Sequence, residues 1–180
     1  MTDMAELPSE PTGWLSDNEL AQVRSELPLL YINAIPVRIN PHGEVTEIGL
    51  LLRADDGVIS RALVAGRVLY HERVRDALIR NLEKDLGSVA LPRVPTSPTP
   101  FAIAEYFPTQ GFGPYFDARQ HAVALAYVVP VDGDCEPSQN ALDIVWLTPE
   151  EAASDEVAQD MGAGQDVLLR QGLAYCGVLP

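Results

Sequence analysis

The sequence predicts an α+β fold or a mixed α/β sandwich, in which a β-sheet is flanked by helices. Several runs are rich in β-branched and aromatic residues, one central stretch has apolar residues at helical spacing, and Gly or Pro turn signals separate them. The 180 residues are 47% hydrophobic and 21% charged, which is typical of one globular domain. We expect a flexible N-terminal tail over residues 1–13 and a single domain over residues 14–180.

A short helix is expected first, over residues 16–27. Ser16 and Glu19 have the spacing of a capping box, apolar residues follow at helical intervals, and Pro28 ends the segment.

Three strands should follow, over residues 31–39, 45–53 and 58–64. Pro36 within the first of them suggests an edge strand or a bulge. Asp56 and Gly57 form a tight-turn signal, so the second and third strands should pair as a hairpin.

The central helix is marked by an apolar stripe at every fourth position. The stripe consists of Val74, Leu78, Leu82 and Leu86, and Gly87 should end the helix in the left-handed conformation. Four prolines in residues 88–100 predict an extended loop. Further strands are expected over 101–107, 121–129 and 142–147, then a helix start at 148–151 and a final helix over about 166–175.

The charge distribution excludes several partners. The formal charge of −14 disfavours nucleic acid polymers and anionic membranes. No apolar run reaches the roughly 20 residues of a membrane helix, a secretory signal is not seen, and two cysteines fit a reducing cytoplasm. Residues 61–84 nevertheless carry a net charge of +3, with six of the 12 basic residues.

Within that basic segment, Gly66, Glu72, Arg80 and Gly87 are separated by five, seven and six residues. This spacing resembles the Nudix box, G-x5-E-x7-R-E-U-x-E-E-x-G-U, where U is aliphatic. Two later segments, 121–127 and 146–151, are similar to a core strand and a strand-to-helix junction of that family. The resemblance covers about residues 30–176 and implies the Nudix α/β/α sandwich. It also implies hydrolysis of a diphosphate linkage with Mg²⁺ or Mn²⁺.

The positions of the family's metal-binding glutamates hold Asn81, Lys84 and Asp85, which makes this a degenerate Nudix box. The resemblance therefore implies Asp85 and Asn81 as the metal ligands, if there are any, and Glu72, Arg80, Glu83 and Asp85 as candidate catalytic residues. Two unit charges about 4 Å apart interact by about 4 kcal/mol at an effective dielectric constant of 20. Lys84 therefore opposes a divalent cation.

The same basic segment could instead bind phosphate groups directly. Arg61, Arg67 and Lys84 are candidate phosphate-binding residues, and Tyr70, Phe112 and Tyr115 are candidates for stacking on a base. His121 could be a general base or a structural histidine. A further carboxylate could come from Asp117, Glu136 or Asp143, each of which could equally be a surface charge.

Three hypotheses remain open. The first is a Nudix-fold protein that binds a nucleotide or another phosphorylated small molecule, with weak or absent metal-dependent pyrophosphohydrolase activity. The second is an active Nudix hydrolase with a rearranged metal site. The third is a non-catalytic interaction module on the Nudix fold, in the form of a homodimer built through the N-terminal helix and the strand carrying Pro36.

Overall fold

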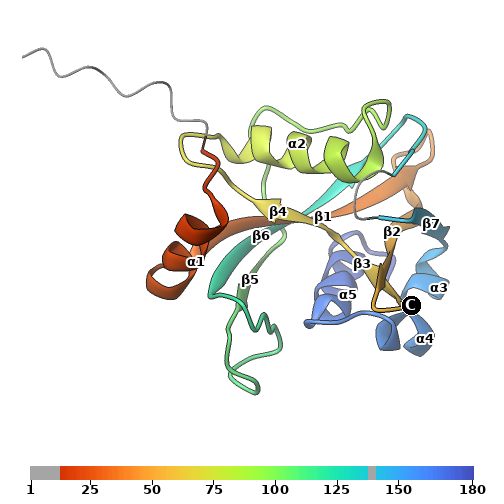
Figure 1. The fold of residues 1–180 in the computed structure, drawn as a ribbon. Coiled ribbons are helices and arrows are strands. Elements are labelled where there is room, and N and C mark those ends of the chain that lie inside the picture. Colours follow the sequence, from red (N-terminus) through yellow and green to blue (C-terminus); the bar gives the residue numbers. More distant parts are fainter. Residues whose placement is uncertain (1–12, 138–140) are drawn as a thin grey trace, which may run out of the picture.

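A computed structural model describes residues 13–137 and 141–180, in which a mixed β-sheet has helices on both faces (Figure 1). The expected tail, residues 1–13, lies outside these ranges except for Gly13. The strands are β1 (Leu29–Ile39), β2 (Val45–Asp55), β3 (Val58–Ala62), β4 (Val64–Arg67), β5 (Ala102–Tyr106), β6 (Ala122–Pro130) and β7 (Asp143–Leu147). The helices are α1 (Asp17–Glu26), α2 (Val74–Leu86), α3 (Pro149–Ala152), α4 (Asp155–Gln159) and α5 (Gln165–Tyr175).

The sheet has seven strands within the described residues, in the order β3-β2-β1-β6-β5, with β4 added on β1 and β7 on β2. Strand β1 is central, parallel to β6 and antiparallel to β2 and β4. The expectation that Pro36 marks an edge is therefore wrong, whereas a bulge does occur in this strand, two residues later, between Arg38 and Ile39. Strand β4 pairs with residues 31–34 and β2 with residues 37–39, so Pro36 lies between the two pairings, where a missing N–H costs no ladder bond.

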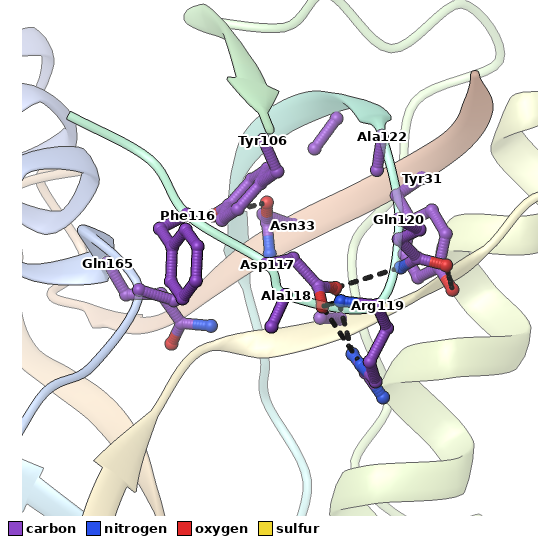
Figure 2. Close-up of a pocket in the computed structure, with 13 residues that line it drawn as sticks. Tyr31, Asn33, Tyr106, Phe116, Asp117, Ala118, Arg119, Gln120, Ala122 and Gln165 are labelled. Carbon is purple, nitrogen blue, oxygen red and sulfur yellow. Dashed lines mark hydrogen bonds and ion pairs between the residues drawn. The ribbon is translucent and has the colours of Figure 1, made fainter. Parts of the chain in front are cut away.

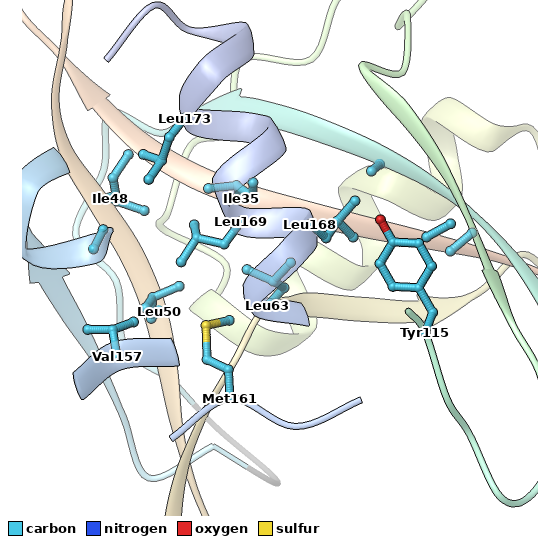
Figure 3. Packing of buried hydrophobic residues seen from close by; sticks show 14 of the residues in the cluster. Ile35, Ile48, Leu50, Leu63, Tyr115, Val157, Met161, Leu168, Leu169 and Leu173 are labelled. Carbon is cyan, nitrogen blue, oxygen red and sulfur yellow. The ribbon is translucent and has the colours of Figure 1, made fainter. Parts of the chain in front are cut away.

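The two faces of the sheet bury separate apolar clusters. On one face, the predicted stripe of α2 places Leu78, Leu82 and Leu86 against Ile32 and Val64. On the other face, α5 packs Leu168, Leu169 and Leu173 against β1 and β2 (Figure 3). Full burial of one such leucine contributes roughly 1.5–3 kcal/mol. The sequence-based prediction of a mixed sheet with flanking helices is confirmed.

The third predicted strand, 58–64, is wrong in one respect, because the chain breaks it at Leu63. The backbone N–H of Leu63 donates to Gln165 Oε1 at 2.9 Å and so leaves the sheet. The chain pairs with β2 before this point and with β1 after it. The break thus turns β4 toward α2 and starts the segment that carries the predicted box.

The predicted helix ends are mostly confirmed. Ser16 and Glu19 form the capping box of α1, and Thr148 and Glu151 form another at α3. Gly87 ends α2 at a φ of +92°, but its ψ of 158° is not the left-handed helical value that we expected. The backbone there packs against Glu136, whose carbonyl oxygen lies 2.8 Å from the position of a Cβ on Gly87. In the described ranges, every helix is too short or too polar to cross a membrane.

Candidate functional site

An ion pair joins the loop after β4 to helix α2. Arg80 donates from Nε to Glu72 Oε1 at 2.7 Å and from a terminal nitrogen to Glu72 Oε2 at 2.9 Å. The same guanidinium donates to the Arg67 carbonyl, and Glu72 accepts the Leu69 N–H, both at 2.8 Å. The Arg80 hydrogen bonds hold the pKa of Glu72 below its ordinary value. These bonds fix the loop on the helix.

The N-terminal segment covers this ion pair. The Trp14 ring lies 5.4 Å from the Arg80 guanidinium carbon, and Arg67 donates to the Gly13 carbonyl at 3.3 Å. A Cβ on Gly13 would lie 2.7 Å from Leu69 Cβ, so the chain crosses the loop in close contact. Arg67, a predicted phosphate-binding residue, is thereby engaged by the N-terminal segment.

The ammonium group of Lys84 lies among three oxygen atoms. Its Nζ is 3.3 Å from the Ala65 carbonyl, 3.2 Å from Asn81 Oδ1 and 3.5 Å from Asp85 Oδ1. Asn81 is buried, and its amide nitrogen donates to the Ala77 carbonyl at 2.8 Å, which turns its oxygen toward Lys84. The side chain of Asn81 also lies against Gly66, where a Cβ would be 1.7 Å from Oδ1. The three box positions are therefore brought together around a lysine.

Asp85 is held between two cations in a buried environment. Its side chain is 3% exposed, with Lys84 at one oxygen and an Arg53 terminal nitrogen 3.7 Å from the other. Burial raises the pKa of Asp85, while the charges of Lys84 and Arg53 act in the opposite direction. Asp85 Oδ2 and Arg53 Nε are both buried without a hydrogen-bond partner.

The oxygen atoms around Lys84 do not fit the needs of a divalent cation. The set offers one carboxylate, one amide oxygen and one backbone carbonyl, and an ammonium group contacts all three. Mg²⁺ is bound by oxygen ligands, with carboxylates supplying the opposite charge. No cluster of three or more His, Cys, Asp or Glu side chains within ranges 13–137 and 141–180 could hold a metal ion. Glu83, the other predicted acid of this helix, lies on its exposed side.

A pocket of about 290 Å³ opens on the face of the sheet opposite α2 (Figure 2). Its walls come from β1, β4, β5, β6, the loop over residues 116–120, and the chain at Ala163 and Gln165. Ala65 lines the pocket, and its carbonyl oxygen also contacts Lys84. The pocket and the Lys84 oxygen set are therefore adjacent through one residue of β4.

One side of the pocket carries a network of charged and amide groups (Figure 2). Asp117 accepts two side-chain bonds from Arg119, both at 2.9 Å, and one from Gln120 at 3.0 Å. Gln120 in turn accepts from Arg24 of α1 at 2.9 Å and from the Tyr31 hydroxyl at 3.3 Å. Burial alone would raise the pKa of Asp117, but the bonds from Arg119 and Gln120 hold it below its ordinary value.

The rest of the lining is neutral. Asn33 of β1 accepts the Tyr106 hydroxyl at 3.4 Å, and burial raises the pKa of Tyr106, which keeps this hydroxyl a donor. Five alanines leave room along the lining, while the Phe116 ring lies at one wall. Small residues beside aromatic rings and amides suit a planar group that hydrogen-bonds at its edges.

The predicted base-stacking residues do not line this pocket. Tyr70 and Phe112 are exposed, and Tyr115 is buried against Tyr106 with the ring centroids 5.3 Å apart. Arg61 also lies outside the pocket lining and forms an ion pair with Asp160 at 3.0 Å.

The other candidates from the sequence are scattered. Asp117 lies in the pocket, His121 stacks on Phe107 with a centroid distance of 4.7 Å, and Glu136 and Asp143 lie outside the pocket lining. Asn33 and Gln120 also line the pocket, although no sequence motif predicts either residue. One signal was available: Asn33 is a polar residue within an apolar strand, which often marks a buried polar site.

The sequence matches, over residues 10–178, the model of a family described as "Domain of unknown function (DUF4916)". Among curated proteins, none matches the sequence. A solved structure from Jonesia denitrificans, described as a possible asymmetric diadenosine tetraphosphate (Ap4A) hydrolase, is similar at 60% identity and a TM-score of 0.84. That match covers 86% of this chain and 98% of the Jonesia chain.

Two more distant solved structures share the fold at 16% identity and a TM-score of 0.58. One is a Caenorhabditis elegans Ap4A hydrolase in a binary complex, and the match covers 83% of this chain and 98% of that one. The other is the Nudix domain of Shewanella oneidensis NrtR with ADP ribose, where the shares are 83% and 89%.

Proposed function

The chain belongs to the family described as domain of unknown function DUF4916 and to the Nudix superfamily. From this premise we propose that it binds a nucleotide or another phosphorylated small molecule, with weak or absent metal-dependent pyrophosphohydrolase activity. One observation carries the proposal: a largely neutral pocket adjoins, through Ala65, a cationic group where the resemblance places a metal.

The two halves of such a ligand suit the two parts of this site. A nucleobase offers a flat ring and edge hydrogen-bonding groups, which match the alanines, Phe116 and the amide of Asn33. A phosphate carries negative charge, which matches Lys84 and Arg53, since both are cations beside one buried carboxylate.

The active-hydrolase alternative is favoured by one observation. The Jonesia denitrificans structure, 60% identical, is described as a possible Ap4A hydrolase. Under this alternative, Asp85 and Glu83 would act with a loop carboxylate, and Mg²⁺ or Mn²⁺ would be the cofactor. The exposed position of Glu83 and the ammonium group beside Asp85 weigh against it.

The test measures binding and hydrolysis separately. Calorimetry with diadenosine tetraphosphate and ADP-ribose should detect binding, and Asn33→Leu should weaken it. Gln22→Leu, which removes an exposed amide on α1, is the control and should bind as the wild type does. Chromatography of the same mixtures with Mg²⁺ or Mn²⁺ should show little product. Turnover in the ordinary range of about 1–10³ s⁻¹ would refute the proposal in favour of the hydrolase.

A further inference from the structure

The oxygen set around Lys84 resembles the surroundings of a bound cation more than those of an ordinary surface lysine. We propose that the Lys84 ammonium is a tethered cation that replaces a divalent metal, so that a phosphorylated ligand binds here without metal. The claim that a phosphorylated ligand binds here rests on the proposed function, whereas the claim that Lys84 replaces the metal does not.

The geometry is the first support. A lysine on the exposed face of a helix usually extends into water, but Lys84 returns to the buried side chains of its own helix, Asn81 and Asp85, and to β4. The side chain of Asn81 is fixed at both ends, by Ala77 on one side and Lys84 on the other. Its oxygen therefore faces the ammonium group and accepts a hydrogen bond from it.

The charge is the second support. Lys84 and Arg53 flank the two oxygens of Asp85, at 3.5 and 3.7 Å. Two cations around one carboxylate leave a charge of +1, which equals that of a divalent ion held by one carboxylate. The set can therefore supply positive charge to a phosphate as a metal would, although it does so with hydrogen-bond donors.

An unsatisfied donor is the third support. Arg53 Nε is buried and has no hydrogen-bond partner, whereas Asp85 Oδ2, the other buried atom without a hydrogen bond, already has the Arg53 guanidinium as its ion-pair partner. Buried polar atoms in this state are rare and call for an explanation. A bound ligand oxygen could accept from Arg53 Nε.

The first experiment measures Mn²⁺ binding with no nucleotide present. Lys84→Glu and the control Arg73→Glu both lower the net charge of −14 by two units, so that they attract Mn²⁺ equally at long range. Arg73 is exposed at the start of α2 and lies outside the oxygen set. Electron paramagnetic resonance should show that Lys84→Glu binds Mn²⁺ at least about tenfold more tightly than the wild type or Arg73→Glu.

Two results would overturn the proposal that Lys84 replaces the metal. Either the wild type binds Mn²⁺ as tightly as Lys84→Glu, or Lys84→Glu gains no more affinity than Arg73→Glu. If Lys84→Glu does not fold, Lys84→Gln removes the ammonium without adding charge. Lys84→Gln should bind Mn²⁺ severalfold better than Arg73→Gln, and equal affinities would again contradict the proposal.

The second experiment measures binding of diadenosine tetraphosphate by calorimetry, in EDTA and in Mg²⁺. The dissociation constants should agree within about twofold, and Lys84→Gln should weaken binding about tenfold while Arg73→Gln should not. Binding only in Mg²⁺ would overturn this inference and leave the proposed function intact. Failure to bind in either buffer would count against the proposed function, while the Mn²⁺ comparison still decides whether Lys84 replaces the metal.

Discussion

At the scale of single residues, Gly66 lies so close to the Asn81 amide that no side chain fits between them. A Cβ at Gly66 would lie 1.7 Å from Asn81 Oδ1, so Gly66→Ala must displace the amide that faces Lys84. We expect a loss of about 2 kcal/mol in the free energy of unfolding. Urea denaturation measures it, with Gly162→Ala as the control, because a Cβ there has no neighbour within 4 Å. Equal losses in both variants would contradict the close contact.

Glu72 should make stability depend on pH. Its hydrogen bonds from Arg80 keep its pKa below the ordinary 4.5 in the folded protein. The ion pair therefore contributes stability above pH 4.5, and this contribution disappears as the pH falls through the lowered value. Glu72→Gln should be destabilised by about 2 kcal/mol at pH 7. Urea unfolding at pH 7 and at pH 3 should show the gap between variant and wild type narrowing in acid, and a constant gap would argue against the ion pair.

At the scale of elements, the sequence predicts most of the helices and strands because their signals are local. The stripe from Val74 to Leu86 and the capping boxes at Ser16 and Thr148 involve residues within a few turns of one another. The break at Leu63 depends on Gln165, which is 102 residues away in sequence. No local pattern contains this contact.

The candidate site likewise has one part that local sequence signals predict and another part that depends on residues far apart in the sequence. The box positions Asn81, Lys84 and Asp85 share one helix face, so that their proximity follows from helical spacing. The pocket instead joins the central strand β1 to the 116–120 loop, and Gln120 meets Arg24 across 96 residues. Such a pocket depends on the tertiary structure, which is why a sequence pattern does not show that Tyr70 and Phe112 lie outside its lining.

The break between β3 and β4 offers a test at this scale. Gln165→Met keeps the length of the side chain but removes the acceptor for the Leu63 N–H. An unpaired buried N–H costs about 1–3 kcal/mol, so the free energy of unfolding should fall by that amount. Hydrogen exchange at Leu63 should accelerate as well. Gln159→Met on the exposed end of α4 is the control, and a Leu63 amide that keeps its protection in Gln165→Met would show another acceptor.

At the scale of the whole molecule, the net negative charge lies outside the segment that contains most of the box positions. The segment from Arg61 to Lys84 carries +3 while the remaining 156 residues carry −17. An anionic ligand is thus repelled by most of the molecule and attracted by this one region, which favours binding there over binding elsewhere.

A homodimer and a cytoplasmic location stay predictions of the sequence. The strand carrying Pro36 has neighbours on both sides and offers no free edge to a second copy.

A single domain over residues 14–180 also stays a prediction, and the two apolar clusters allow it to be tested. Leu82 and Leu169 are buried on opposite faces of one sheet, and β1 supplies residues to both clusters. If the sheet couples them, Leu82→Ala and Leu169→Ala should each lower the free energy of one common transition by about 2–5 kcal/mol. Tryptophan fluorescence, which follows Trp146 beside the α2 cluster and Trp14 beside Arg80, and far-ultraviolet circular dichroism should then give coincident urea curves in both variants. Two separated transitions, with only the one on the mutated side shifted, would divide the chain into independent units.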